Sequence, residues 1–456
     1  MKTIHIALPL AVALTVSGCV MAPKGTQAER AKAEQIGKIY EKHEVPPLPG
    51  NPTWRDVLQQ AFLANGELES RYFEWRAALE RVTEAASYPN TNLSLGFSYM
   101  FSGGRMKAWD RTTISAQPDP MQSLSLPVKV QQKGKVALAE ARSAGEKFRA
   151  AKFDLQKRVL TAYLDYALLA EKTRIQQRNL RLLQSLRDDA TSRLQTGGPQ
   201  QDLLKAQIQY RLAEDRLKNF QAELQQSRAN LNSLIGRKVD AALSPPATLP
   251  QARAVPADDS KLIAVGVDQN PELAALAHEV QGRKDAIELA RLQYLPDINP
   301  IAAITGSLSQ TLGASLSIPL SIPALKAAVE ENRALLNSTQ ALARQTKLDR
   351  AAGFIATIYA IRNSERQIAL LNDRILPAAE ELFTASRQSY STANVPYSEL
   401  IGSQQTLQDV RLMLAEARTE REKRLAELEQ LAGVDVETLG KETPAKPQAA
   451  EVKSHE

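Results

Sequence analysis

The chain has 456 residues, of which 24% are charged and only 5% are aromatic, and its formal net charge is +6. So few aromatic residues suit long helices better than one large globular core. Basic and acidic residues alternate along the predicted helices, as between Glu420 and Arg424, and no basic cluster is interleaved with aromatic residues. This pattern is typical of solvated helix faces and argues against a nucleic-acid partner.

The N-terminus is similar to a secretory signal. Lys2 is followed by an apolar segment over residues 4–16, which is too short to span a bilayer. The stretch Val16-Ser17-Gly18-Cys19 resembles a bacterial lipoprotein box, and Cys19 is the only cysteine. The resemblance implies a signal peptide over 1–18, acylation of Cys19, a lipid-anchored, extended tether over 19–52 and, because Val20 follows, sorting to the outer membrane. An ordinary signal peptide with a chance cysteine is the alternative.

The first strand pattern follows a predicted helical segment that begins near residue 53. Apolar or aromatic side chains alternate with small or polar ones at Leu93, Leu95, Phe97, Tyr99 and Phe101. This period of two predicts a strand at about 91–101, and a weaker alternation predicts a second strand at about 122–128, after an exposed loop over 105–120. Strands of this length with one apolar face fit the wall of a transmembrane barrel, and a hairpin on a soluble domain is the alternative.

A long helical hairpin is predicted next, over residues 134–236. Apolar residues recur in steps of three and four on both sides of a turn at Thr196-Gly197-Gly198-Pro199, and no proline interrupts either arm. Helices this long must lie against other long helices, as in a coiled coil. Alone, the stretch would indicate a rod or spacer.

The same order of elements then repeats. A proline-rich linker over 237–258 leads to a helix, strands at about 297–305 and 310–319, and a second helical hairpin over 323–433, kinked at Pro377 and reversed between Thr392 and Pro396. Repeat 1 covers 53–236 and repeat 2 covers 259–433, with a disordered tail over 434–456. Matching landmarks are Asn65 and Asn270, Pro89 and Pro296, Pro127 and Pro319, and Gly236 and Gly433.

With this tandem repeat the chain resembles the outer-membrane efflux protein family, the TolC-like channels, in its lipoprotein branch. The resemblance implies a mainly α fold with a small β part: a homotrimer that shares one 12-stranded transmembrane barrel and an α-helical tunnel across the periplasm. It also implies a passive exit duct of a tripartite efflux pump, with a periplasmic adaptor, an inner-membrane pump and outer-membrane lipid as partners and no cofactor. The cargo stays open between small toxic compounds, metal ions and, in a type I secretion duct, proteins.

No pattern in the chain indicates an enzyme. The four histidines, His5, His43, His278 and His455, are isolated from one another, and no glycine-rich phosphate loop or cysteine cluster accompanies them. A periplasmic coiled-coil adaptor or structural lipoprotein is the alternative class. Adaptors, however, usually carry one helical hairpin and not two copies behind paired strands.

The two hairpin turns hold the candidate site residues. Glu399 matches a position where the family often carries a pore-lining acid, although the family's second acid is Gly402 here. The further candidates for the pore constriction are Asp202, Tyr390 and Arg193. The candidates for the tip that contacts the adaptor are Gly197, Gly198, Pro199, Asn394, Val395 and Pro396. No metal site is predicted: a path for soft metal ions along Met100, Met106 and Met121 is weighed against ordinary packing, which is preferred.

Overall fold

The fold is taken from a computed structural model that describes residues 20–42, 45–88, 93–101, 104–118, 125–256, 258–392 and 394–436. The chain forms two compact units. Unit 1 draws on residues 1–38, 70–148 and 272–347, and unit 2 on residues 39–69, 149–271 and 348–456. Each unit therefore contains segments of both sequence repeats, so a repeat is not a separate domain.

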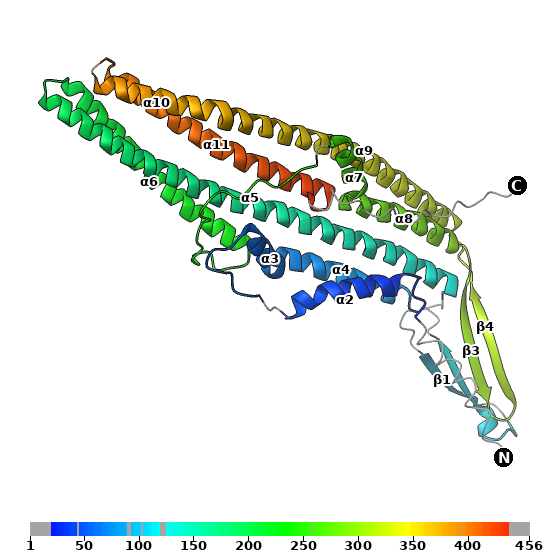
Figure 1. The fold of residues 1–456 in the computed structure, drawn as a ribbon. Coiled ribbons are helices and arrows are strands. Elements are labelled where there is room, and N and C mark those ends of the chain that lie inside the picture. The colour runs from blue at the N-terminus through cyan, green and yellow to red at the C-terminus, as the bar shows by residue number, and fades with distance from the viewer. Residues whose placement is uncertain are drawn as a thin grey trace. The chain divides into compact units, whose positions relative to one another are not determined.

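Unit 1 contains one antiparallel sheet whose four strands follow one another in chain order. The strands are β1 (Leu93–Tyr99), β2 (Thr112–Pro118), β3 (Asp297–Thr305) and β4 (Ser309–Ser317). β3 and β4 form a long hairpin (Figure 1), and β2 pairs with β3 through Ile114 and Ile304. The sheet thus joins a strand pair from repeat 1 to a strand pair from repeat 2.

The second strand of repeat 1 lies earlier than the predicted range of 122–128, inside the stretch 105–120 that was predicted to be a loop. The partner of β1 is β2, which pairs Phe97 with Ile114 and follows a single 3-10 turn, η1 (Trp109–Arg111). Residues 121–124 lie outside the described residues, and Pro127 already begins helix α5 (Pro127–Gln195). A proline is well suited to a helix start because an N–H group at that position has no helical acceptor, so its absence costs no hydrogen bond.

The N-terminal segment is helical where the sequence suggested an extended tether. Helix α2 (Thr26–Lys42) lies along α4 (Gly66–Ala85) in unit 1 (Figure 1). The Arg30 guanidinium donates to Glu80 Oε2 at 2.6 Å and to Thr83 Oγ1 at 2.6 Å, and the Tyr72 hydroxyl donates to the Ala33 carbonyl. Helix α2 contains many Ala, Glu, Lys and Gln residues, which are strong helix formers, and its contacts with α4 stabilise the helix further.

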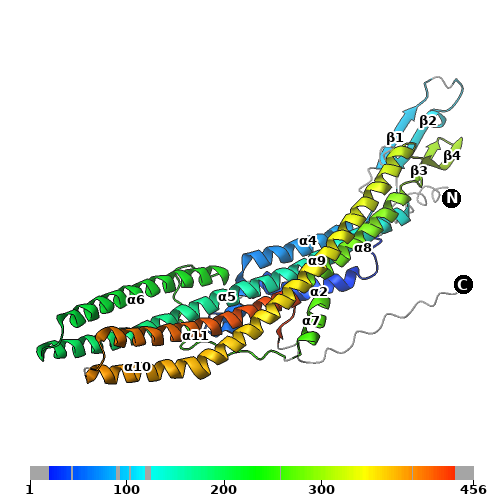
Figure 2. The same ribbon diagram turned by 90° about the horizontal axis from the view of Figure 1, so that it is seen from above.

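Unit 2 consists of helices joined by the proline-rich linker. Its short helices are α3 (Trp54–Ala64) and α7 (Asp259–Asp268), and α8 (Pro271–Leu292) begins at its boundary. The end of α5 pairs with α6 (Gln200–Leu234), and α10 (Leu376–Ser391) pairs with α11 (Tyr397–Ala432), as Figure 2 shows. The two hairpin turns lie at the same end of the unit. None of the described helices is long and apolar enough to cross a membrane.

The predicted kink at Pro377 takes the form of a π-helical turn. Helix α9 (Ile322–Leu370) runs into the π turn η2 (Leu371–Ile375), and Pro377 is the second residue of α10. A proline leaves the carbonyl four residues earlier without its helical donor, and that carbonyl belongs to Asp373 inside the turn. The helix α5 of the first hairpin has no such interruption.

The landmark residues of the two repeats make equivalent contacts in unit 2. The Asn65 side-chain amide donates to the Leu234 carbonyl at 2.9 Å, and the Asn270 amide donates to the Leu431 carbonyl at 2.6 Å. Each contact ties the start of one helix to the last turn of a long helix. The glycines that follow those helices, Gly236 and Gly433, have φ angles of +67° and +66°. A side chain at Gly236 would overlap Ala64, and one at Gly433 would overlap Pro271.

Charged residues attach the proline-rich linker to the C-terminal end of α11. The Arg253 guanidinium lies 3.1 Å from the Glu422 carboxylate and 2.8 Å from the Glu429 carboxylate; both carboxylates are buried and Arg253 is largely buried. Arg421 pairs with Glu365 on α9 at 2.8 Å. Burial raises the pKa of Glu429, although Arg253 lowers it in part. This set of residues, Arg253, Arg421, Glu365, Glu422 and Glu429, is called the charged clamp below.

Candidate functional site

The first hairpin turn is built by two glycines and a proline. Gly197 has a φ angle of +93°, and the Gly198 N–H donates to the Arg193 carbonyl at 2.8 Å across five residues. This is the bond pattern of a Schellman motif, in which the residue after the helix adopts a left-handed conformation that favours glycine. A Cβ atom at Gly198 would lie 2.9 Å from the Arg193 oxygen. Chain reversal therefore accounts for both glycines.

The second turn closes with the same type of bond but without glycine. The Asn394 N–H donates to the Ser389 carbonyl at 2.9 Å, and its side-chain amide donates to Thr392 Oγ1 at 2.9 Å. Val395 packs against the core below the turn. Pro396 is the N-cap of α11, as Pro199 is the N-cap of α6.

Each turn places one acid at the third position of the following helix. These acids are Asp202 on α6 and Glu399 on α11, and neither helix has a side-chain cap from its N-cap proline. A negative charge in the first turn is favoured by the unpaired N–H groups and the helix dipole. Asp202 is half-buried, whereas Glu399 is exposed, and the position of a Cβ atom at Gly402 is open on the same face.

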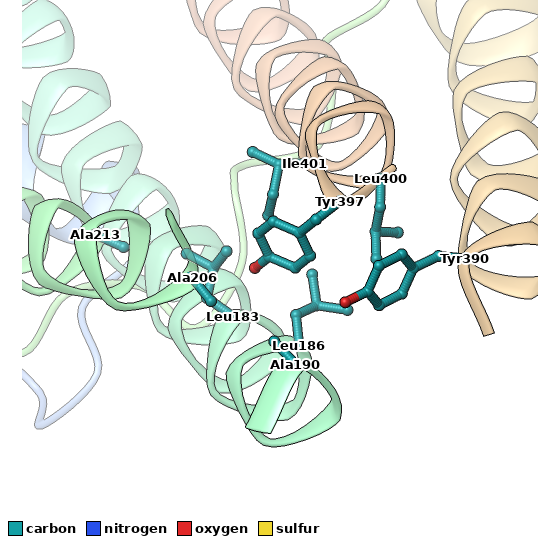
Figure 3. Packing of buried hydrophobic residues seen from close by; sticks show 9 residues of the cluster. All are labelled: Leu183, Leu186, Ala190, Ala206, Ala213, Tyr390, Tyr397, Leu400 and Ile401. Atoms are coloured by element: carbon teal, nitrogen blue, oxygen red, sulfur yellow. The ribbon is translucent and has the colours of Figure 1, made fainter. Parts of the chain in front are cut away.

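An apolar core lies directly below the two turns. Figure 3 shows Tyr390 of α10 and Tyr397 of α11 facing Leu183 and Leu186 of α5. The full set of buried residues is Leu183, Leu186, Ala190, Ala206, Ala213, Tyr390, Tyr397, Leu400 and Ile401. The core includes residues of both hairpins, so it holds the two turns together.

A cation and two aromatic rings join the hairpins at this core. The Arg193 guanidinium lies 4.3 Å from the centre of the Tyr390 ring and donates to the Tyr390 carbonyl at 3.1 Å. The Tyr390 and Tyr397 rings meet edge to face with their centres 5.5 Å apart. Burial raises the pKa of Tyr390 and of Tyr397, and the negative charge of Asp202 adds to both rises.

Four of the candidate residues therefore separate into two groups. Arg193, Tyr390 and Asp202 come together, whereas Glu399 stands apart on the exposed face of α11. Sequence reasoning missed Tyr397, which is fully buried and whose phenol oxygen has no hydrogen-bond partner among the described residues. An aromatic residue directly after the N-cap proline, seven positions from Tyr390, was the available indication.

The strands of unit 1 expose apolar side chains. All nine residues of β4 are exposed, and Leu312 and Leu316 keep 81% and 60% of their surface accessible. On β1 the corresponding residues are Leu95 and Phe97, at 70% and 73%. Among the described strands, β1 and β4 each have one edge that pairs with no strand.

Two further predictions concern residues near the N-terminus and the strands. Cys19 lies outside the described residues, but Met21 follows two positions later, and its N–H donates to the Ala86 carbonyl at 2.8 Å. Of the three methionines, Met100 is exposed beyond β1, the Met106 carbonyl accepts a bond from Arg111, and Met121 is not among the described residues.

Comparison with known proteins adds to this picture. A protein-family model described as "Outer membrane efflux protein" matches residues 57–237 and 265–434. A curated relative, the fusaric acid resistance protein FusA of Burkholderia cepacia, is 30% identical over 186 residues, which are 37% of this chain and 32% of that protein. The chain therefore spans about a third of that relative's length.

Solved structures resemble the fold at low sequence identity. The outer membrane protein VceC of Vibrio cholerae matches with a TM-score of 0.70 and 14% identity, covering 84% of this chain and 96% of that chain. The open state of the outer membrane channel MtrE of Neisseria gonorrhoeae matches with a TM-score of 0.69 and 16% identity, covering 85% and 90%. Since the family model matches both repeats and most of the chain, the protein belongs to the outer membrane efflux protein family.

Proposed function

We propose that this chain is the exit duct of a tripartite efflux pump in the outer membrane, a passive conduit for small toxic compounds. The observation that carries the proposal is the sheet of unit 1, with its exposed apolar faces and two free edges. Exposed apolar faces are unfavourable in water but favourable in the hydrocarbon of a membrane. A sheet in lipid must also close, because each unpaired N–H or C=O group at an edge costs several kcal/mol there.

Closure requires other copies of the chain. Four strands are too few for a barrel, and three sheets of four strands give the twelve strands of one shared barrel. In this trimer, β4 of one copy pairs with β1 of the next, and the helical hairpins form a tunnel. The turn residues from Gly197 to Pro199 and from Asn394 to Pro396 then form the tip that meets the periplasmic adaptor, through which an inner-membrane pump supplies the energy.

The proposal includes a lipid anchor on Cys19. Removal of residues 1–18 would leave Cys19 two residues before Met21, whose N–H is bonded at the end of α4, just before the strands. Two residues span at most about 7 Å, so the acyl chains would enter the membrane close to the start of the strands. Helix α2 docks on α4 beyond that point, which makes the anchor a fixed attachment and not a loose tether.

Glu399 is proposed to line the constriction near the tip. In a trimer its carboxylate would form a ring of three, which favours cations in the pore. Arg193, Tyr390 and Asp202 would hold the surrounding hairpins in the closed arrangement. The name of the curated relative makes fusaric acid one of the first compounds to test as cargo.

The central experiment measures accumulation in cells that lack this chain. Dyes, antibiotics, fusaric acid and divalent metals are compared with and without the intact chain, and outer-membrane fractions are examined for an SDS-resistant, heat-sensitive trimer. Raised accumulation of one compound class, reversed by the intact chain, supports the duct. A monomeric lipoprotein without an accumulation phenotype would favour the adaptor or structural class, and a defect confined to protein export would favour a secretion duct.

Two variants test the residues assigned to the lipid anchor and to the constriction. Cys19→Ala should lower the amount of chain in the outer membrane. Glu399→Gln should reduce cation selectivity of the purified channel in planar bilayers, while Asp409→Asn, on the exposed face of the same helix, serves as the matched control. Equal selectivity of the Glu399→Gln channel and the parent would remove Glu399 from the constriction.

A further inference from the structure

A buried row of amide side chains connects the two hairpins next to the apolar core. Its four members are Gln176 and Asn179 on α5 and Gln404 and Gln408 on α11. Their exposed fractions are 0%, 8%, 3% and 7%, so water reaches none of them freely. No other role in the proposed duct accounts for four buried amides, and leaving such groups buried without partners would cost stability. This set is called the amide ladder.

The amide ladder is continuous across three helices. Gln404 Nε2 donates to Asn179 Oδ1 and, at 3.3 Å, to Gln408 Oε1. Gln408 Nε2 donates to Gln176 Oε1 at 2.6 Å, and Gln176 Nε2 donates to the Ala213 carbonyl of α6 at 2.8 Å. Hydrogen bonds in such a chain polarise one another, and each requires a particular direction and distance.

The apolar core and the amide ladder restrain α11 differently. Contacts between Leu400 or Ile401 and the leucines of α5 are non-directional, so they tolerate a change in the rotation of α11 about its axis. The ladder does not, because a rotated α11 would leave buried amides unpaired. A buried polar residue in a coiled coil fixes register in the same way, at some cost in stability.

The position of the ladder relates it to Glu399. Gln408 follows Glu399 by nine residues, which is about 2.5 turns at ~3.6 residues per turn, so the two side chains lie on opposite sides of α11. The burial agrees, because Gln408 is buried and Glu399 is exposed. Any rotation that releases Gln408 from Gln176 therefore turns Glu399 by the same angle.

We propose that Gln176, Asn179, Gln404 and Gln408 are positioning residues, whose hydrogen bonds fix the rotation of α11 against α5 and so direct Glu399 into the constriction. The placement of Glu399 rests on the proposed function, whereas the fixed rotation does not. The ladder joins two segments of one chain, so it acts within each subunit. The ladder thereby determines which face of α11 each subunit directs toward the constriction.

The test removes both partners of the central bond. In Gln176→Met/Gln408→Met the side-chain length is kept and the bond between Gln408 and Gln176 is lost without leaving either amide facing an absent partner, while Gln404 keeps its bond to Asn179. The matched control is Gln405→Met, which removes an exposed glutamine of the same helix that meets Gln209 at 3.4 Å. If the double variant does not assemble into trimers, the single variant Gln408→Met is measured in its place.

The first readout is structural and independent of transport. Spin labels are placed on introduced cysteines, Asp188→Cys on α5 and Ser398→Cys on α11, both at exposed positions. Labelled chains are diluted in unlabelled ones so that distances within one chain dominate, and the parent without these cysteines reports any labelling of Cys19. The second readout is the ion selectivity and conductance of the same variants in planar bilayers.

The ladder variant is expected to show a broader distribution of distances between the two labels. The share of molecules in which α11 has another rotation against α5 should rise roughly tenfold, which corresponds to a free-energy change of about 1.4 kcal/mol. Its channel should also be less selective for cations, while Gln405→Met matches the parent in both readouts. An unchanged distribution overturns the role of the ladder. A broader distribution with unchanged selectivity supports the fixed rotation and overturns the placement of Glu399 in the proposed duct.

Discussion

The two ends of α11 are held by different chemistry. At the turn end, the contacts are apolar side chains, neutral amides and one cation over an aromatic ring. At the other end α11 also has an apolar core, which includes Leu425 and Leu428, but there the charged clamp adds Arg253 between two buried carboxylates. A buried charge that loses its partner costs far more than an apolar contact that shifts. We therefore expect a rearrangement of α11 to occur at the turn end and not at the clamp end.

The largest effect is expected from breaking the clamp. Arg253→Met leaves the buried Glu429 without its cation, whereas Glu422 keeps Arg421, and the loss should lower the free energy of unfolding by about 3–5 kcal/mol. Thermal unfolding of the purified protein measures this loss. Arg424→Met is the control, because Arg424 makes exposed ion pairs with Glu420 and Glu427 that are worth only about 0–1 kcal/mol. Equal losses in the two variants would contradict the large contribution assigned to the buried clamp.

The Arg253→Met variant should also regain stability in acid relative to the parent. Burial raises the folded-state pKa of Glu429, so this carboxyl binds its proton more readily when folded, and its contribution to stability falls as pH rises from the unfolded value to the folded one. Without Arg253 the folded pKa rises further. The stability gap to the parent should therefore narrow as the pH falls through the folded pKa toward the unfolded one, by about 1.4 kcal/mol for each unit by which the variant raises the folded pKa. A gap that does not change with pH would exclude Glu429 as the responsible group.

A smaller effect is expected at the turn end. Arg193→Met removes the cation over the Tyr390 ring and one bond to a carbonyl, which together contribute about 1–2 kcal/mol. Chemical denaturation should show this loss, and the same variant should raise channel leak in planar bilayers. Arg181→Met, at an exposed position of the same helix, is the control for loss of charge. A loss as large as that of Arg253→Met would contradict the smaller contribution assigned to this cation.

The smallest effect is expected for the hydroxyl of Tyr397. Since this buried oxygen has no partner among the described residues, Tyr397→Phe should leave stability unchanged or raise it by up to about 1 kcal/mol. Tyr397→Ala, by contrast, opens a cavity and should cost about 3–5 kcal/mol. Unfolding curves of the two variants separate the ring from the hydroxyl. Marked destabilisation by Tyr397→Phe would reveal a hydrogen bond to the hydroxyl in the assembled protein.

Local patterns in the sequence were sufficient to predict the long hairpins, their turns at Pro199 and Pro396, and the paired strands of repeat 2. The periodicity of Leu312, Ala314 and Leu316 requires no knowledge of a distant partner. The landmark Asn65 and Asn270 were visible as a repeat, and the structure supplies their physical reason, the bonds to Leu234 and Leu431. Each pair is separated by more than 160 residues, so its contact could not be read from local sequence.

The features that sequence reasoning missed all depend on distant partners. Most residues of β2 are polar or small and show no clear alternation, so this strand is recognised by its pairing with β3 and not by its sequence pattern. Helix α2 is a strong helix former whose docking on Glu80 and Thr83 could not be inferred from its composition. The amide ladder is scattered over two helices, where single glutamines are common surface residues. Tyr397 belongs to the same class, because its burial depends on leucines of α5.

The interleaving of the two repeats has a consequence for how the molecule is made. Unit 2 needs residues 39–69 and residues 348–436, so the earliest part of the unit is synthesised long before its last helix exists. Contacts of such long range form slowly and leave apolar surface exposed in the meantime. A newly made chain must therefore be shielded from aggregation until α11 is complete, and a protein shortened before residue 397 lacks the helix that closes the unit.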